Sequence, residues 1–71
     1  MSDVQHHRRR NLESVRARLG ITVTEIARRM GVTAGYVSQL KHARTPFYED
    51  TARNIENALS LRPGALDVET N

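Results

Sequence analysis

The amino-acid sequence predicts a small all-α domain, compact and built from four to five helices. Apolar residues recur at three- and four-residue spacing in successive short segments, as they do on the buried face of an amphipathic helix. Glycine, threonine and proline separate these segments, and they are typical of helix ends and turns. The chain has 71 residues, which is enough for one small core and too few for a large enzyme cavity.

The composition excludes several classes of protein. With no cysteine, the chain can form no disulfide and no cysteine-ligated zinc site. No apolar run approaches the roughly 20 residues of a membrane span, and the polar, basic N-terminus lacks the apolar stretch of a signal peptide. We therefore expect a cytoplasmic protein with no membrane partner.

The charge is unevenly distributed along the chain. Residues 1–44 hold nine Arg/Lys and three Asp/Glu, a net charge of +6, whereas residues 45–71 hold two and five, a net charge of −3. A basic half of this kind suits a polyanionic partner, although a solvated basic face is the alternative explanation.

The N-terminal residues carry little apolar periodicity. We expect residues 1–7 to form a flexible arm, and the adjacent His6 and His7, without a distant partner, predict no metal site and no cofactor. The following run Arg8-Arg9-Arg10 is suited to neutralising phosphates or entering a narrow minor groove. A solvated charge run at a helix start is the alternative.

Three helices are predicted in the basic half. The first ends near Gly20, and the second begins at Thr22 as N-cap, with Glu25 completing a capping box. Gly31 can take the left-handed conformation that ends the second helix, and Thr33 can cap the third. The predicted inward-facing residues are Leu12, Val15 and Leu19 in the first helix, Ile26, Ala27 and Met30 in the second, and Val37 and Leu40 in the third.

The acidic half predicts one long helix and one short one. After a loop over residues 41–46, either Phe47 or Tyr48 should be buried, and an exposed aromatic side chain would indicate a dimer contact. Glu49 or Asp50 opens a helix whose apolar stripe is Ala52, Ile55, Ala58 and Leu59. Pro63 suits the first position of a one-turn fifth helix, and residues 68–71 should be a flexible tail.

The central segment resembles the helix-turn-helix of the phage repressor and Cro family, also called the Xre-like family. The matching residues are Ile26-Ala27, Gly31-Val32-Thr33, Val37-Ser38 and Leu40. The resemblance implies a repressor-like DNA-binding domain over residues 8–67 that places its third helix, about residues 33–41, in the major groove of double-stranded DNA. It also implies a bacterial or phage-infected cell.

The resemblance implies that Ala34, Gly35 and Gln39 read bases, and Ser38 lies on the same outward face. The Gln39 amide can pair in bidentate fashion with adenine, although it is alternatively a solvated helix residue. Ser38 can donate to a base or instead to its own helix carbonyl. Glycine in a helix interior costs about 1 kcal/mol relative to alanine, and close approach to the bases would offset that cost at Gly35. Poor optimisation of a small natural protein is the alternative.

Two departures from the family pattern affect the predicted phosphate contacts. Val23 replaces a common glutamine, so phosphate there must use a backbone N–H, Thr22 or Thr24. Lys41 replaces a common glutamate, so Arg16 must pair with Glu13 or Glu25, or both cations turn toward DNA. The full set of predicted phosphate contacts is Thr22, Thr24, Arg28, Thr33, Tyr36, Lys41, Arg44, Arg8, Arg9 and Arg10.

These patterns predict a sequence-specific transcriptional regulator and no enzyme, because no catalytic constellation is present. Selectivity predicts a homodimer on a pseudo-palindromic operator, with Phe47, Tyr48, Leu61, Ala65 and Leu66 as candidate dimer contacts. A related possibility is the DNA-binding half of a switch with a second small protein. The other class left open is an antitoxin-like or adaptor module that keeps the fold with weak or no specific DNA binding.

Overall fold

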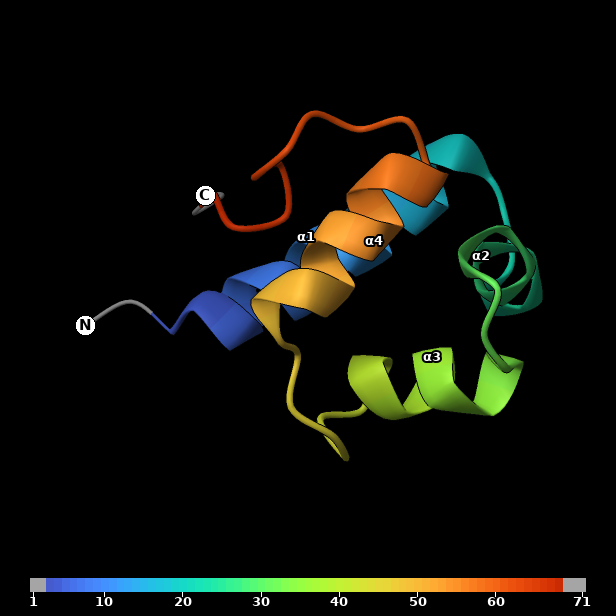
Figure 1. Ribbon diagram of the computed structural model, residues 1–71, viewed down its shortest axis with the longest axis horizontal. Helices are drawn as coiled ribbons and strands as arrows, with labels where there is room; N and C mark the ends of the chain where they lie inside the picture. The colour runs from blue at the N-terminus through green and yellow to red at the C-terminus, as the bar shows by residue number, and fades with distance from the viewer. Residues whose placement is uncertain (1–2, 69–71) are drawn as a thin grey trace.

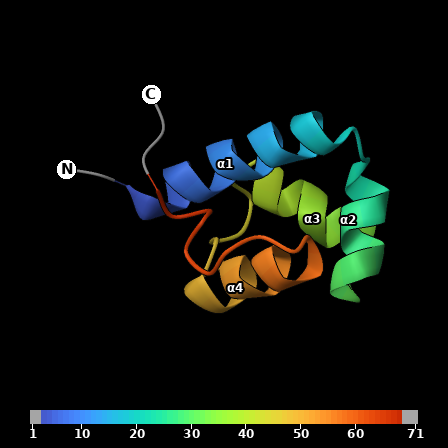
Figure 2. The same ribbon diagram turned by 90° about the horizontal axis from the view of Figure 1, so that it is seen from above.

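The computed structural model describes residues 3–68, and this part of the chain contains four helices and no strand. The helices are α1 (Val4–Leu19), α2 (Val23–Met30), α3 (Ala34–Lys41) and α4 (Glu49–Ala58). In Figures 1 and 2, α1 and α4 run in similar directions, and α2 lies across one end of the molecule. The all-α prediction is confirmed.

The first helix begins earlier than predicted. Asp3 is its N-cap, and the Asp3 carboxylate accepts hydrogen bonds from the backbone N–H groups of Gln5 and His6 at 3.0 and 3.3 Å. Residues 4–7 therefore form the first turn of α1 rather than a separate arm. The C-terminal end is as predicted, at Gly20 with φ of 67°. Residues 1–2 of the predicted arm lie outside the described residues.

The connection between α2 and α3 follows local capping rules. Thr22 and Thr33 accept hydrogen bonds from the backbone N–H groups of Glu25 and Tyr36, both at 3.1 Å. Gly31 ends α2 with φ of 77°, a left-handed conformation that costs glycine little. These caps were predicted, but the Glu25 carboxylate pairs with Arg28 and Arg29 rather than returning to the Thr22 N–H as in a capping box.

The core is shared by all four helices and the two segments that flank α4. Phe47, just before α4, is fully buried and Tyr48 is 63% exposed, which settles the choice that the sequence left open. The buried apolar residues are Leu12, Val15, Ile26, Ala27, Met30, Val37, Leu40, Phe47, Ala52, Ile55, Leu59 and Leu66. The predicted inward faces of α2 and α3 are confirmed in this set. Of the stripe predicted for α4, Ala52, Ile55 and Leu59 are buried and Ala58 is half-buried, whereas Leu19 of α1 is exposed.

The predicted fifth helix is not formed. Residues 63–67 instead make consecutive turns, in which the Ala65 N–H donates to the Arg62 carbonyl and the Asp67 N–H to that of Gly64, both at 3.0 Å. The buried Glu56 carboxylate accepts the N–H groups of Gly64 and Leu66 at 2.9 Å each. Side-chain acceptance of these two donors replaces the backbone bonds of a helix.

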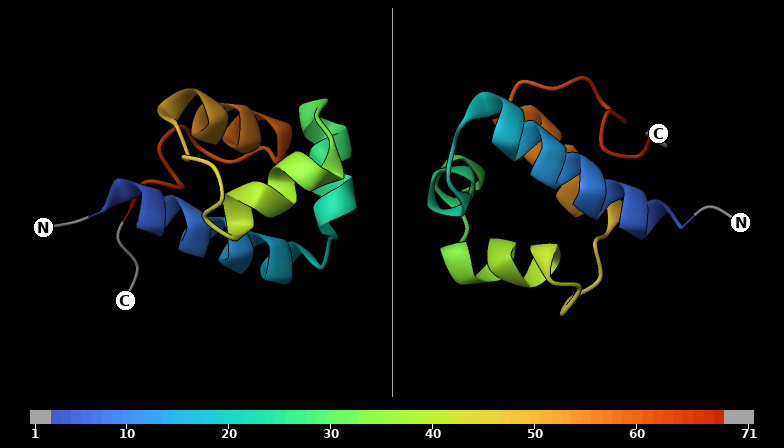
Figure 3. Two further views of the ribbon diagram at one scale, coloured as in Figure 1. Left: turned by 90° about the horizontal axis from the view of Figure 1, so that it is seen from below. Right: turned by 180° about the vertical axis from the view of Figure 1, so that it is seen from behind.

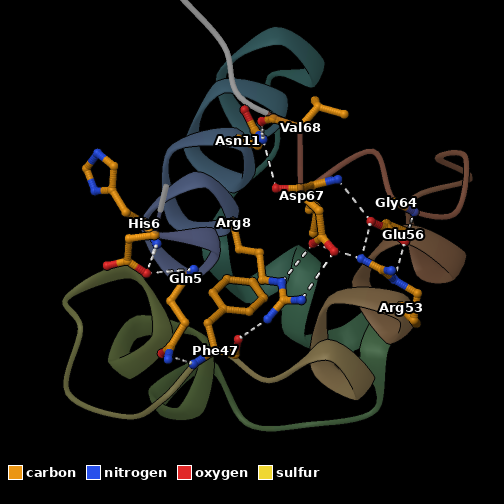
Figure 4. A network of polar contacts seen from close by, with 12 residues as sticks. Gln5, His6, Arg8, Asn11, Phe47, Arg53, Glu56, Gly64, Asp67 and Val68 are labelled. Carbon is orange, nitrogen blue, oxygen red and sulfur yellow. Dashed lines mark hydrogen bonds and ion pairs between the residues drawn. The ribbon is translucent and has the colours of Figure 1, made fainter. Parts of the chain in front are cut away.

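A polar network holds this C-terminal segment against α1 and α4 (Figure 4). Arg8 donates to both carboxylate oxygens of Asp67, at 2.7 and 3.2 Å, and Arg53 bridges Asp67 and Glu56. Asn11 donates to the carbonyl of Leu66 at 2.8 Å and to that of Val68 at 2.7 Å. Val68 of the predicted tail is thus tied to α1, and residues 69–71 lie outside the described part. None of the helices described is long and apolar enough to cross a membrane.

Candidate nucleic-acid interface

The outer face of α3 carries all four predicted base-reading residues. Val37 and Leu40 are fully buried on the opposite side, so Gly35 and Gln39 are exposed and Ala34 and Ser38 are half-buried. His42 lies exposed just beyond the end of the helix. The outer face of α3 thus presents the Gln39 amide, the Ser38 hydroxyl and, at Gly35, backbone without a side chain.

Packing inside the protein does not require glycine at position 35. A Cβ atom built on Gly35 would meet only the Thr33 hydroxyl oxygen, at 4.0 Å, which is an ordinary contact distance. Alanine would therefore fit and would favour the helix by about 0.5–1 kcal/mol. Internal packing therefore gives no reason for a glycine at this exposed position.

The N-terminal end of α2 carries the predicted threonines. Thr22 and Thr24 are exposed, while Val23 packs against the core and has no polar group to offer. The Thr22 hydroxyl accepts from the Glu25 N–H, which leaves its own proton as a donor. Free N–H groups at this helix end add a partial positive charge, as in many anion sites.

Glu25 pairs with both arginines of α2. Arg29 donates to its carboxylate at 2.7 Å, and Arg28, whose side chain is 70% exposed, also pairs with it. Hydrogen bonds from Arg28 and then Arg29 lower the pKa of Glu25 to about 2. The three side chains carry one net positive charge, and both guanidinium groups stay at the surface.

Glu13 likewise pairs with two cations, one from α1 and one from α3. Arg16 pairs with it at 2.7 Å and Lys41 at 3.2 Å, which resolves the alternatives for Arg16 in favour of Glu13. Hydrogen bonds from Arg16 and then Lys41 lower the pKa of Glu13 to about 2. Lys41 is thereby held at the C-terminal end of α3 by a carboxylate from α1.

Tyr36 faces α4. Its hydroxyl lies 3.2 Å from that of Thr51, and its ring is half-buried against the core. The ring therefore covers part of the core, and the hydroxyl, predicted to contact phosphate, has a partner within the protein.

The N-terminal arginines occupy three different positions. Arg8 is 7% exposed and donates to Asp67 and the Phe47 carbonyl, so its guanidinium is unavailable for the predicted phosphate contact. Arg9 is half-buried and donates to the carbonyls of Leu40 and Thr45, and Arg10 is exposed. The sequence signal for the burial of Arg8 is its spacing, because Arg8, Leu12 and Val15 share one helix face once α1 extends upstream.

The candidate dimer contacts also differ in exposure, and some are buried while others lie at the surface. Phe47 and Leu66 are fully buried inside the single chain, so they close its core rather than meeting a partner. Tyr48 is exposed, and Leu61 and Ala65 line a shallow groove between α1 and the C-terminal segment. Those three are accessible at the surface.

Arg44 is exposed in the loop after α3, beyond the paired Lys41. Within residues 3–68, no three histidine or acidic side chains lie close enough together to hold a metal ion.

No family model matches the chain, and no similarity to a curated protein or to a solved structure was found.

Proposed function

We propose that the protein is a sequence-specific double-stranded DNA-binding transcriptional regulator of the repressor/Cro type. The observation that carries the proposal is α3 itself, which is packed against α2 through a capped three-residue turn and leaves Gly35 and Gln39 exposed. A helix of this kind fits the major groove with its outer face toward the base edges. In this proposal, α2 and α3 are the two helices of a helix-turn-helix.

Each residue of the outer face has a distinct role. Gln39 pairs in bidentate fashion with adenine, which is worth about 1–3 kcal/mol of discrimination between bases. Ala34 offers a methyl group for contact with a thymine methyl, and Ser38 donates one hydrogen bond. Gly35 allows the helix backbone to approach the bases closely, which accounts for a glycine that internal packing does not need.

Salt-dependent affinity comes from the cations around this face. Arg44, Lys41 and Arg28 contact phosphates, together with the N-terminal N–H groups and threonines of α2. Glu13 and Glu25 hold Lys41 and Arg28 in place beforehand, which reduces the entropy lost on binding. A homodimer on half-sites about one helical turn apart supplies selectivity, with Tyr48, Leu61 and Ala65 as candidate contacts.

Selection of bound duplexes from a randomised pool at two salt concentrations tests the proposal. We expect wild type to yield a palindromic motif and Gln39→Ala to lose base preference at one position in each half-site. Asn57→Ala, an exposed polar truncation on α4, is the matched control and should return the wild-type motif. A wild-type pool without any motif would reject the proposal.

A second candidate is a protein-interaction module with the same fold. The internal pairing of Arg28, Arg29 and Lys41 with glutamates favours it, because these ion pairs reduce the positive charge that the α2–α3 surface offers to phosphate. Copurification of a second small protein at fixed stoichiometry, without duplex binding at low salt, would establish this function instead.

A further inference from the structure

The loop that follows α3 (residues 42–48) adopts a conformation that its own residues disfavour. Ala43 has φ of 60°, the left-handed region in which glycine is usual at a helix end. The Ala43 N–H donates to the Leu40 carbonyl at 3.4 Å, and the Arg44 N–H to the Gln39 carbonyl at 2.9 Å. This pattern of bonds ends α3 sharply and leads the chain to Arg44.

The N-terminal half of α1 holds this loop at both ends. At the start, the Arg9 Nε donates to the Leu40 carbonyl at 3.0 Å, and its Nη2 reaches the Thr45 carbonyl at 3.1 Å. At the far end, the Gln5 side-chain oxygen accepts from the Phe47 N–H at 3.0 Å, and Arg8 donates to the Phe47 carbonyl at 2.7 Å. We call Gln5, Arg8 and Arg9 the loop clamp.

The figures show how the clamp reaches its target. In Figure 3 the loop, drawn in yellow, passes beside the N-terminal half of α1, and Figure 4 shows Gln5 and Arg8 converging on Phe47 from one helix. Phe47 is fully buried, so the end of the loop is fixed by packing as well as by hydrogen bonds. Arg44, at the middle of the loop, remains exposed between these anchors.

The chemistry of Arg9 suits this role better than direct phosphate contact. Its planar guanidinium spans two carbonyls from opposite sides of the turn and so fixes the distance between them, which the single ammonium group of lysine cannot do. Leu40 lies in the last turn of α3, where carbonyls carry partial negative charge, and that favours a cation. The donors Nε and Nη2 are already engaged inside the protein.

We propose that Gln5, Arg8 and Arg9 are positioning residues that set the loop for DNA, with Arg9 acting through loop geometry and not through contact with phosphate. The inference rests on the proposed DNA-binding function. Its consequence is that DNA affinity depends on residues at the start of α1 that never touch the duplex. Because Ala43 is strained, release of the clamp lets the loop relax and carries Arg44 away from its phosphate.

Arg9→Lys is the main test, since it keeps the charge and removes the bridge. We expect about a tenfold loss in duplex affinity, as for one lost charge-assisted hydrogen bond, and a slope against salt concentration that is lower by about one, because Arg44 leaves its phosphate. Amide hydrogen exchange of residues 42–47 should increase at the same time. Arg18→Lys makes the same chemical change on an exposed residue of α1 and is the matched control, expected to behave as wild type.

Two further variants separate positioning from general stability. Gln5→Ala removes the acceptor for the Phe47 N–H without changing charge, and we expect a smaller loss of affinity with faster exchange in the same loop. Gln5→Ala also provides the test of the clamp if Arg9→Lys does not fold. Adding Ala43→Gly to Arg9→Lys should recover part of the affinity, because glycine holds the left-handed conformation without strain. All variants are assayed well below their unfolding temperatures.

Three outcomes would overturn the inference, and they are distinguishable. Wild-type affinity and loop exchange in both Arg9→Lys and Gln5→Ala would show that the clamp does not position the loop. Wild-type binding by Arg9→Lys, together with weaker binding and a salt slope lower by about one for Arg9→Gln, would make Arg9 a phosphate contact. If wild type itself binds no duplex, the proposed function fails and the role of the clamp in DNA binding fails with it.

Discussion

The two ends of α3 are built in opposite ways. Its N-terminal end uses residues that are neighbours in sequence, since Gly31 turns the chain and Thr33 caps the helix. Its C-terminal end places an alanine where glycine would be expected and depends on Gln5, Arg8 and Arg9 of α1. The comparison shows that one end of a helix can be read from local sequence, while the other can require partners 31 or more residues away.

The largest expected effect on stability comes from the α1 residues that hold the C-terminal end of α3. Arg8→Ala leaves the Phe47 carbonyl without its side-chain donor and removes one of the two cations that pair with Asp67, in a largely buried site. We expect a loss of about 3 kcal/mol in the free energy of unfolding, measured by chemical denaturation. Arg18→Ala, the exposed control on α1, should change it by less than about 0.5 kcal/mol. An equally small change for Arg8→Ala would mean that the network contributes little.

The same network predicts a pH dependence. Hydrogen bonds from Arg8 and Arg53 lower the pKa of Asp67, against the opposing effect of partial burial. The contribution of Asp67 to stability is therefore present above the ordinary pKa of 3.8 and is lost as the pH falls through the lowered pKa. Asp67→Asn should therefore be less stable than wild type near neutral pH, by about 2 kcal/mol. Denaturation curves measured down to about pH 2 should show this difference shrinking; a constant difference would contradict the assignment.

A pair of substitutions tests the backbone at the two ends directly. Gly31→Ala should cost about 1–2 kcal/mol, because φ of 77° is strained for alanine. Ala43→Gly should instead stabilise the folded protein by up to about 1 kcal/mol, since it relieves the same strain. Thermal unfolding of both variants checks the opposite signs. The same sign for both would remove the contrast between the two ends.

Loss of the Thr33 cap should have a slightly smaller effect. Thr33→Ala removes the acceptor of the Tyr36 N–H and should cost about 1 kcal/mol, whereas Thr33→Ser should retain most of the stability. Thr24→Ala, an exposed threonine just inside α2, is the control. If Thr33→Ser is as unstable as Thr33→Ala, the hydroxyl is not the stabilising group.

The smallest expected change in stability concerns Gly35, in the first turn of α3. Gly35→Ala should stabilise the protein by about 0.5–1 kcal/mol, and in the proposed complex it should weaken DNA binding, because the added methyl meets the bases. Unfolding and duplex titration measured on the same samples test the opposite effects. A variant that is both more stable and an equal binder would leave the glycine without a role in recognition.

Some individual residues were predictable because their behaviour depends on near neighbours. The caps at Thr22 and Thr33, the left-handed Gly20 and Gly31, and the inward Val37 and Leu40 follow from spacing of three or four residues. The fifth helix was predicted wrongly, because Pro63 and Ala65 suit a helical turn locally. The deciding group is the Glu56 carboxylate, which comes from α4 and takes the N–H groups of Gly64 and Leu66.

Composition and periodicity by themselves determined the all-α class, the placement of α2, α3 and α4, and the outward face of α3, because helix periodicity and capping act within about four residues. Only the tertiary structure decided which of Phe47 and Tyr48 is buried, that Arg8 belongs to the interior, and that Glu13 holds Arg16 and Lys41 together. Arg8 meets Asp67 across 59 positions of sequence. The three arginines of the run have the same chemistry, and the direction of each side chain from α1 gives Arg8 and Arg9 different partners and leaves Arg10 exposed.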